Sequence, residues 1–289
     1  NVPQPVAVTG AQKTIDYLGA LLLIAATTSL IACVDHRIME SLTPALRVSS
    51  VIAFVAVFIG FLYRERTTPS PILDLSLFRI RMFSLSALAL LLVGVAQVMI
   101  GFVLPFYLQD VLHLKPSFIG LLFVSAPIFT VTLSPLVGWA VDKMGPRVPA
   151  TIGISFLAAA GFFGSYLRPD SHWLAAVGVL ALWGLATAMF FTSNHTAMIT
   201  SVRTEHRGVA TGAIYVTFGL GTTFGVSLGT MLLTTAFRYY SGDPTATPSA
   251  ANPEVFVRAM NFSFTVGGSM ALLAMLSSAL RGEREARTH

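Results

Sequence analysis

The chain has 289 residues, of which 54% are hydrophobic and only 11% carry a charge. A globular domain has about 25% charged residues, so this composition argues strongly against a soluble enzyme or a DNA-binding protein. The formal net charge of +5 does not point to nucleic acid, because the basic residues are scattered among apolar runs as they are in membrane proteins. The single cysteine, Cys33, allows no internal disulfide and no cysteine-built metal site. We therefore predict an all-α, polytopic membrane protein.

Eight stretches of the chain are apolar and free of Asp, Glu, Lys and Arg. A transmembrane helix needs about 20 such residues to cross the hydrocarbon core, and only the second stretch is short. Gly and Pro inside a stretch are compatible with a helix because neighbouring helices can satisfy the freed backbone groups. The eight predicted spans are 17–34, 48–63, 82–109, 117–141, 148–167, 172–201, 208–237 and 259–280.

The distribution of Lys and Arg predicts the orientation. With the N-terminus inside, 12 of the 18 basic residues lie on the inner side and 6 on the outer side. We therefore expect a multi-pass protein of the plasma (inner) membrane with both ends in the cytoplasm. The outer segment 238–258, with three prolines, should be an irregular loop, and part of the inner segment 64–81 could lie along the membrane surface.

The most specific local pattern joins the fourth and fifth spans on the inner side. It reads Gly-Trp-Ala-Val-Asp-Lys-Met-Gly-Pro-Arg over residues 138–147. Asp142 can pair with a cation or cap the next helix, although an ordinary positive-inside loop with one acidic residue has about equal weight. The candidate gating residues are Gly138, Asp142, Lys143, Gly145 and Arg147.

This loop resembles the G-x-x-x-D-[RK]-x-G-x-[RK] motif of the major facilitator superfamily. The run Leu-Pro-Phe-Tyr-Leu-Gln at 104–109 resembles a helix ending of its fourteen-helix drug:proton antiporters, and Gly-Val-Ala-Thr-Gly at 208–212 is similar to their glycine-rich penultimate helix. The sequence departs from this family at Tyr215 and Phe218, where Asn and Arg are usual, and at Pro146, where a basic residue is frequent.

The resemblance implies that the chain is the C-terminal eight helices of such a transporter. Residues 1–81 would hold two extra helices and a linker, residues 82–281 the C-terminal six-helix bundle, and residues 282–289 a cytoplasmic tail. The N-terminal six-helix domain would then be absent from the chain.

Five glycines are predicted to pack helices together. Three of them recur at four-residue intervals within the seventh span and so share one helical face, which lets two backbones approach closely. A nucleotide-binding loop is excluded because no strand precedes the glycines. The packing candidates are Gly208, Gly212, Gly221, Gly225 and Gly229.

Polar groups inside a membrane are costly and usually functional. Gln97 and Gly101 share a helical face that could line a cavity, with Tyr107 near its outer end, or Gln97 could simply bond a neighbouring helix. We include Asn194 and Tyr215 as further cavity candidates. His195 lies near a span end and fits a structural role better than proton coupling, and the Phe162–Phe163 and Phe190–Phe191 pairs fit packing or lipid contact better than a drug pocket.

None of the predicted spans has Asp or Glu in its interior. Proton-coupled export needs a group that binds and releases a proton within the membrane, so we expect the coupling acid in the missing N-terminal half. By resemblance the partners are an amphipathic small molecule such as a drug, protons and the lipid bilayer. A lipid, siderophore or metabolite as cargo, or a non-transporting fragment, remain alternatives. No enzyme motif or metal-ligand spacing occurs, so we expect neither catalysis nor a cofactor.

Overall fold

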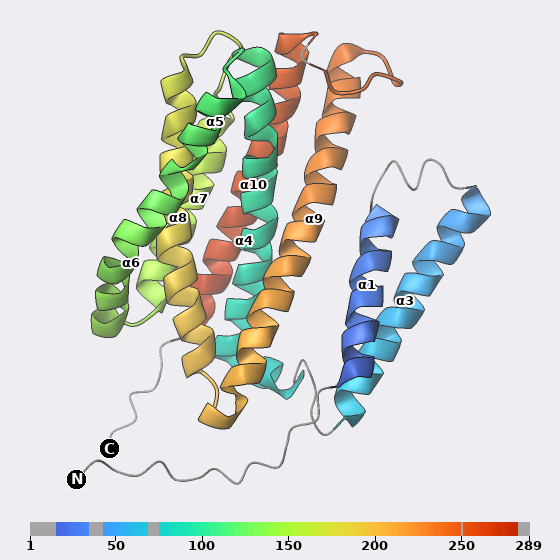
Figure 1. Cartoon of the computed structure of the whole chain (residues 1–289), viewed down its shortest axis with the longest axis vertical. Coiled ribbons are helices and arrows are strands. Elements are labelled where there is room, and N and C mark those ends of the chain that lie inside the picture. Colours follow the sequence, from blue (N-terminus) through green and yellow to red (C-terminus); the bar gives the residue numbers. More distant parts are fainter. Residues whose placement is uncertain (1–15, 35–42, 69–74, 250, 283–289) are drawn as a thin grey trace.

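The computed structural model describes residues 16–34, 43–68, 75–249 and 251–282, and every regular element within them is a helix. Eight long segments alternate in direction between the two ends of the molecule (Figure 1). The α-helices are α1 (Tyr17–Val34), α3 (Pro44–Thr67), α4 (Arg81–Phe106), α5 (Pro116–Phe123), α6 (Ser125–Met144), α7 (Arg147–Gly164), α8 (Trp173–Thr200), α9 (Arg207–Ser241) and α10 (Pro253–Leu280). Short helical turns are η1 (Leu75–Arg79), η2 (Tyr107–Val111), which is a π-helical turn, and η3 (Thr204–His206).

The prediction of a polytopic helical membrane protein is confirmed. Within the described residues, seven helices are long and apolar enough to cross a membrane. Helices α5 and α6 together make one of these spans, which is broken at Val124. The first predicted span, 17–34, coincides with the 18-residue helix α1, but it is not among these seven.

Several predicted boundaries differ from the observed ones. Helix α10 begins at Pro253 rather than at residue 259, because the proline occupies the first turn and the Asn252 side chain accepts from the Val255 N–H. Charged residues such as Arg258 lie inside its first turns, so a sequence criterion that excludes charges places the start of the span too late. The outer loop is correspondingly shorter than predicted. Of the inner segment 64–81, residues 69–74 lie outside the described residues.

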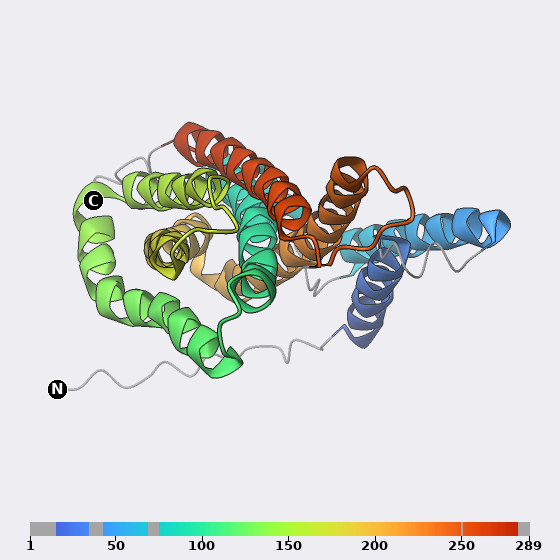
Figure 2. The same ribbon diagram turned by 90° about the horizontal axis from the view of Figure 1, so that it is seen from above.

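Helix α4 forms the centre of the bundle and packs against α7, α8, α9 and α10 (Figure 2). The most apolar stretch of α4 and η2 is 61% buried, whereas that of α5 and α6 is only 11% buried. Fully buried α4 residues include Leu90, Met99 and Leu104. Helix α4 therefore supplies much of the core, and the α5–α6 span leaves most of its apolar surface uncovered by this chain.

Helices α1 and α3 form a pair beside α9 (Figure 1). At one end of the pair, Arg64 Nε and Nη2 donate to the two carboxylate oxygens of Asp16 at 3.2 and 3.1 Å. These bonds, with the Gly19 N–H, hold the pKa of Asp16 below its usual range. The division at residues 81 and 281 stays a prediction, although the pair does lie to one side of the α4–α10 bundle.

Candidate functional site

Two of the five packing glycines lie directly against the backbone of α4. A Cβ on Gly221 would collide with the Leu91 carbonyl oxygen, and one on Gly225 would lie 2.8 Å from the Val95 carbonyl oxygen. Gly229 is in ordinary contact distance of Met99, whereas Gly208 faces open space and Gly212 is half-buried. Close approach of α4 and α9 therefore depends on Gly221 and Gly225.

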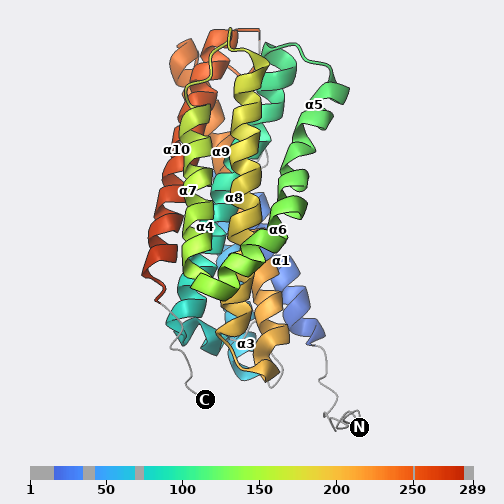
Figure 3. The same ribbon diagram turned by 90° about the vertical axis from the view of Figure 1, so that its left-hand side faces the viewer.

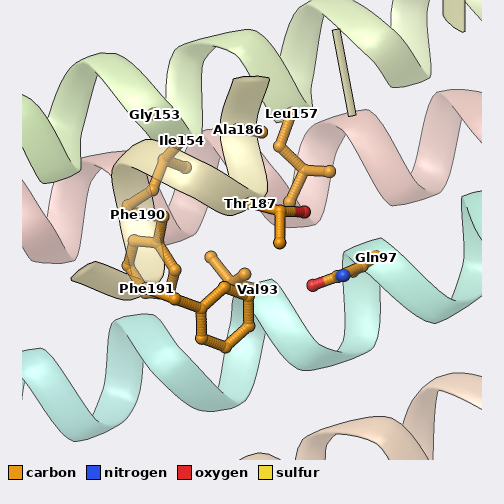
Figure 4. Close-up of a pocket in the computed structure, with 9 residues that line it drawn as sticks. All are labelled: Val93, Gln97, Gly153, Ile154, Leu157, Ala186, Thr187, Phe190 and Phe191. Carbon is orange, nitrogen blue, oxygen red and sulfur yellow. The ribbon is translucent and has the colours of Figure 1, made fainter. Parts of the chain in front are cut away.

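The space around Gln97 lies at the middle of the spans, between α4, α7 and α8. It is a narrow gap with about 180 Å³ of space between atoms, which leaves no room for a water molecule in this state, and the Gln97 side chain points into it (Figure 4). Most of the lining is apolar, with Gln97 and Thr187 as the polar side chains. The lining residues are Val93, Gln97, Gly153, Ile154, Leu157, Ala186, Thr187, Phe190 and Phe191.

Two buried polar atoms near this pocket lack a hydrogen-bond partner among the described residues. They are the acceptor Gln97 Oε1 and the donor Trp183 Nε1. Helices α4 and α8 are antiparallel, and Gln97 on α4 lies opposite Thr187 on α8. One turn further along, Gly101 lies opposite Trp183, so close that a Cβ on Gly101 would be 3.4 Å from the indole ring. A buried polar atom without a partner costs free energy, so this face presents one acceptor and one donor that a ligand could satisfy.

Aromatic side chains border the pocket on the α8–α9 side. The ring of Phe191 meets Phe218 edge to face at 5.0 Å between centroids, and it also contacts Phe190 and His195. Phe190 is fully buried, in agreement with packing, but both Phe190 and Phe191 line the pocket. The ring contacts of Phe191 agree with the packing role that the sequence favoured, although Phe191 also lines the gap beside Gln97.

The other cavity candidates lie away from this pocket. Tyr107 is buried directly after α4, where its hydroxyl donates to the Arg168 carbonyl at 2.7 Å. Tyr215 is 68% exposed on α9. Asn194 is fully buried, but it belongs to a polar cluster at the opposite end of the bundle. The structure thus brings Gln97 and Gly101 together with α8 and separates them from Tyr107, Tyr215 and Asn194.

The loop motif 138–147 forms the turn between α6 and α7. Gly145 has a φ of 76°, which an L side chain rarely adopts, and it reverses the chain before Arg147 starts α7. The Lys143 ammonium lies over the Trp139 ring, 4.3 Å from its centroid. Asp142 is exposed and forms no ion pair within the described part of the chain.

A buried arginine at the same end of the bundle escaped the sequence reading. Arg281, directly after α10, is only 2% exposed. Its Nη1 donates to Asn194 Oδ1 at 2.9 Å and to Ser86 Oγ at 3.3 Å, and its Nη2 donates to the Pro146 carbonyl. Arg281 thus ties α4, α8 and α10 to the turn of the loop motif.

The charge of Arg281 persists at neutral pH. Burial and the neighbouring Arg147 lower the pKa of Arg281 to about 10, which still leaves the guanidinium protonated. From the sequence it was one more basic residue following the last span. Its position directly after the last apolar residue of the span was the one local signal that it is buried. Its partner Asn194 is 87 residues away in sequence, so no local pattern predicts their hydrogen bond.

The alternating bundle of apolar helices defines a multi-pass membrane protein. Residues 17–226 and 86–287 match the family model of the Major Facilitator Superfamily, and the chain belongs to this family. Members of this family move small molecules across membranes and are not enzymes.

Curated relatives include transporters of different cargo. The chain is 32% identical to the "Uncharacterized transporter YebQ" of Escherichia coli over 195 residues, which are 67% of this chain and 42% of that protein. It is 25% identical to the "Riboflavin transporter RibZ" of Clostridioides difficile over 284 residues, 95% of this chain and 58% of that protein. It is 29% identical to the "Multidrug resistance protein Stp" of Mycobacterium tuberculosis over 224 residues, 76% of this chain and 41% of that protein. The chain spans about half the length of the curated relatives it matches.

Proposed function

We propose that the chain is the C-terminal part of a proton-coupled exporter of drugs or other amphipathic small molecules. Two helical bundles would alternately expose a midplane site to each side of the membrane. The observation that carries this proposal is the mid-span gap between α4, α7 and α8, which Gln97, with its unsatisfied Oε1, and the ring of Phe191 line. The second unsatisfied atom, Trp183 Nε1, lies one turn along α8 from the lining residue Thr187. An aromatic wall with one acceptor and one donor suits a flat amphipathic molecule.

The other half of the site would come from an N-terminal bundle outside this chain. The α5–α6 span leaves most of its apolar surface uncovered, which gives such a bundle a surface to pack on. Among the described residues, the carboxylates of the α4–α10 bundle lie at the ends of spans or in loops, so the group that carries the coupled proton would also belong to the N-terminal half. In this proposal the Asp142 end of the bundle faces the cytoplasm.

A metabolite is the second candidate cargo. A relative that covers 95% of this chain is named a riboflavin transporter, and riboflavin is flat and offers both donors and acceptors, as the pocket requires. Gln97 and Trp183 would then select a cargo by its pattern of hydrogen-bond donors and acceptors more than by its general amphipathic character.

The first test is transport by the full-length protein in liposomes with an imposed pH gradient. Ethidium is the drug-like probe and riboflavin the metabolite probe. If Gln97 Oε1 accepts from the cargo, Gln97→Leu should slow its transport about two- to tenfold, as expected for one lost hydrogen bond. Gln109→Leu is the control, because Gln109 is exposed at the outer end of α4.

The outcomes separate the alternatives. Ethidium efflux that depends on the gradient supports proton-coupled drug export, and riboflavin transport alone supports the metabolite reading. Movement of neither probe, or equal rates with and without the gradient, would contradict the proposal, and equal effects of the two substitutions would remove Gln97 from the site.

A further inference from the structure

A second, larger pocket opens at the end of the bundle opposite Arg281. It has a volume of about 570 Å³ and lies between the α7–α8 loop and the first turns of α10. Helices α7 and α10 run side by side (Figure 3). Its floor is apolar, since Leu167 and Val257 are each only 2% exposed. The other lining residues are Arg168, Pro169, Asp170, Glu254, Arg258 and Asn261.

The rim of this pocket carries two positive and two negative side chains. Arg168 and Asp170 come from the loop, and Glu254 and Arg258 come from α10. All four are exposed, and none forms an ion pair within the described ranges of the chain. Opposite charges that surround one hollow without pairing with each other are available to a ligand that itself carries both signs.

Asn261 adds an unsatisfied acceptor to the pocket. Its Nδ2 donates to the Leu167 carbonyl at 3.0 Å, which fixes the amide between α10 and the loop. Its Oδ1 is buried and has no hydrogen-bond partner among the described residues. Because an amide oxygen only accepts, this atom calls for an N–H donor, and with Asp170 and Glu254 it forms an acceptor set suited to a primary ammonium.

The surroundings of the pocket indicate that the ligand is a lipid. The pocket lies just beyond the end of the α7 span and at the first turns of the 28-residue α10, so in a bilayer it would lie near the membrane–water interface. Large apolar side chains next to it in sequence are exposed, namely Phe163, Tyr166 and Phe262. Exposed apolar side chains that neighbour a polar pocket suit the acyl chains of a lipid whose headgroup occupies it.

We propose that this pocket binds the headgroup of a phospholipid that carries a primary ammonium, as phosphatidylethanolamine does. The ammonium is held by Asp170, Glu254 and Asn261 Oδ1, and the phosphate by Arg168 and Arg258. The site is separate from the mid-span pocket, and its occupancy does not require that the protein transports a drug.

The test is native mass spectrometry of the full-length protein purified with equal amounts of phosphatidylethanolamine and phosphatidylcholine. Phosphatidylcholine has the same phosphate but a quaternary ammonium without N–H, so the protein should retain phosphatidylethanolamine preferentially. Glu254→Gln and Asp170→Asn should each reduce this preference about two- to fivefold, as expected for one exposed charge contact. Both residues are exposed, so a thermal unfolding curve should show that the variants remain folded.

Two controls make the result specific. Glu205→Gln removes an exposed carboxylate at the opposite end of the bundle and should leave the preference unchanged, and Arg258→Gln should weaken retention of both lipids equally. Equal retention of the two lipids by the unaltered protein, or the same loss in Glu205→Gln, would overturn the proposal. Displacement of the lipid by soluble glycerophosphoethanolamine at millimolar concentration would show that the site takes a free zwitterion, and would overturn its assignment to lipid.

Discussion

Arg281 illustrates how one side chain can hold several helices together. A buried charge is costly unless hydrogen bonds replace its hydration. Here Asn194, Ser86 and the Pro146 carbonyl accept from the two Nη groups without a carboxylate in the described part of the cluster, while Nε has no partner among the described residues. The guanidinium also lies at the C-terminus of α10, where the helix dipole favours a positive charge. Its planar set of donors reaches two other helices, α4 and α8, and a turn at once, which a lysine could not do.

We therefore expect Arg281→Ala to destabilise the full-length protein. It would leave the buried Asn194 Oδ1 without a donor, at a cost of about 1–3 kcal/mol, and the unfolding temperature in detergent should fall. Arg281→Lys should recover only part of the loss. The control is Arg79→Ala, which removes an exposed arginine at the same end and should change little; an equal shift in both variants, or a rise for Arg281→Ala, would contradict the assigned role.

At the scale of elements, the contact between α4 and α9 depends on glycine at particular positions. Gly94 and Gly221 face each other, since a Cβ on Gly94 would lie 3.2 Å from the Gly221 backbone. Packing of this kind replaces the hydrophobic effect as the force between helices in lipid, because lipid tails are as apolar as side chains. Two residues before Gly221, Gly219 is exposed and faces open space.

This arrangement predicts opposite outcomes for the same substitution at two nearby positions. Gly221→Ala would push its Cβ into the Leu91 carbonyl and should destabilise the protein by about 1–3 kcal/mol. Gly219→Ala should be neutral or slightly stabilising, because alanine favours a helix over glycine by about 0.5–1 kcal/mol. Thermal unfolding of both variants checks this, and similar curves would show that the α4–α9 contact is loose.

The elements also show what the sequence could reveal. Apolar runs located the spans and the glycine periodicity identified Gly221 and Gly225, because both signals are local along the chain. The start of α10 was missed since Glu254 and Arg258 interrupt the apolar run, although Asn252 and Pro253 mark a helix start. Trp183, Phe191 and Arg281 could not be singled out, since their roles depend on contacts between helices distant in sequence.

For the whole molecule, the important contrast is between its two ends. One end holds the Gly145 turn, the buried Arg281 cluster and the exposed Asp142, and the other holds the charged pocket of the α7–α8 loop. Between them lies the pocket of Gln97. If two bundles rock about that midplane site, Asp142 is placed to pair with the second bundle in only one of the two states.

Asp142→Asn should therefore change the balance of states without changing proton coupling. Loss of one exposed ion pair should alter substrate efflux by the full-length protein about two- to fivefold, with proton flux changing in proportion. Parallel measurement of both fluxes in liposomes checks this, with Glu205→Gln as an exposed carboxylate at the same end. Abolished proton flux with an intact conformational cycle would place Asp142 in the coupling machinery and contradict the proposal.

The place of Arg281 in the chain has a consequence for biosynthesis. Ser86, Pro146 and Asn194 enter the membrane long before residue 281 has been synthesised, and until then Asn194 Oδ1 lacks the donor that satisfies it in the finished bundle. This end of the bundle can therefore close only after the last helix has been inserted. The bundle is thus completed by a residue that is synthesised after the last span. A chain that ended before Arg281 would retain every membrane span but would lack the hydrogen bonds that hold this end of the bundle together.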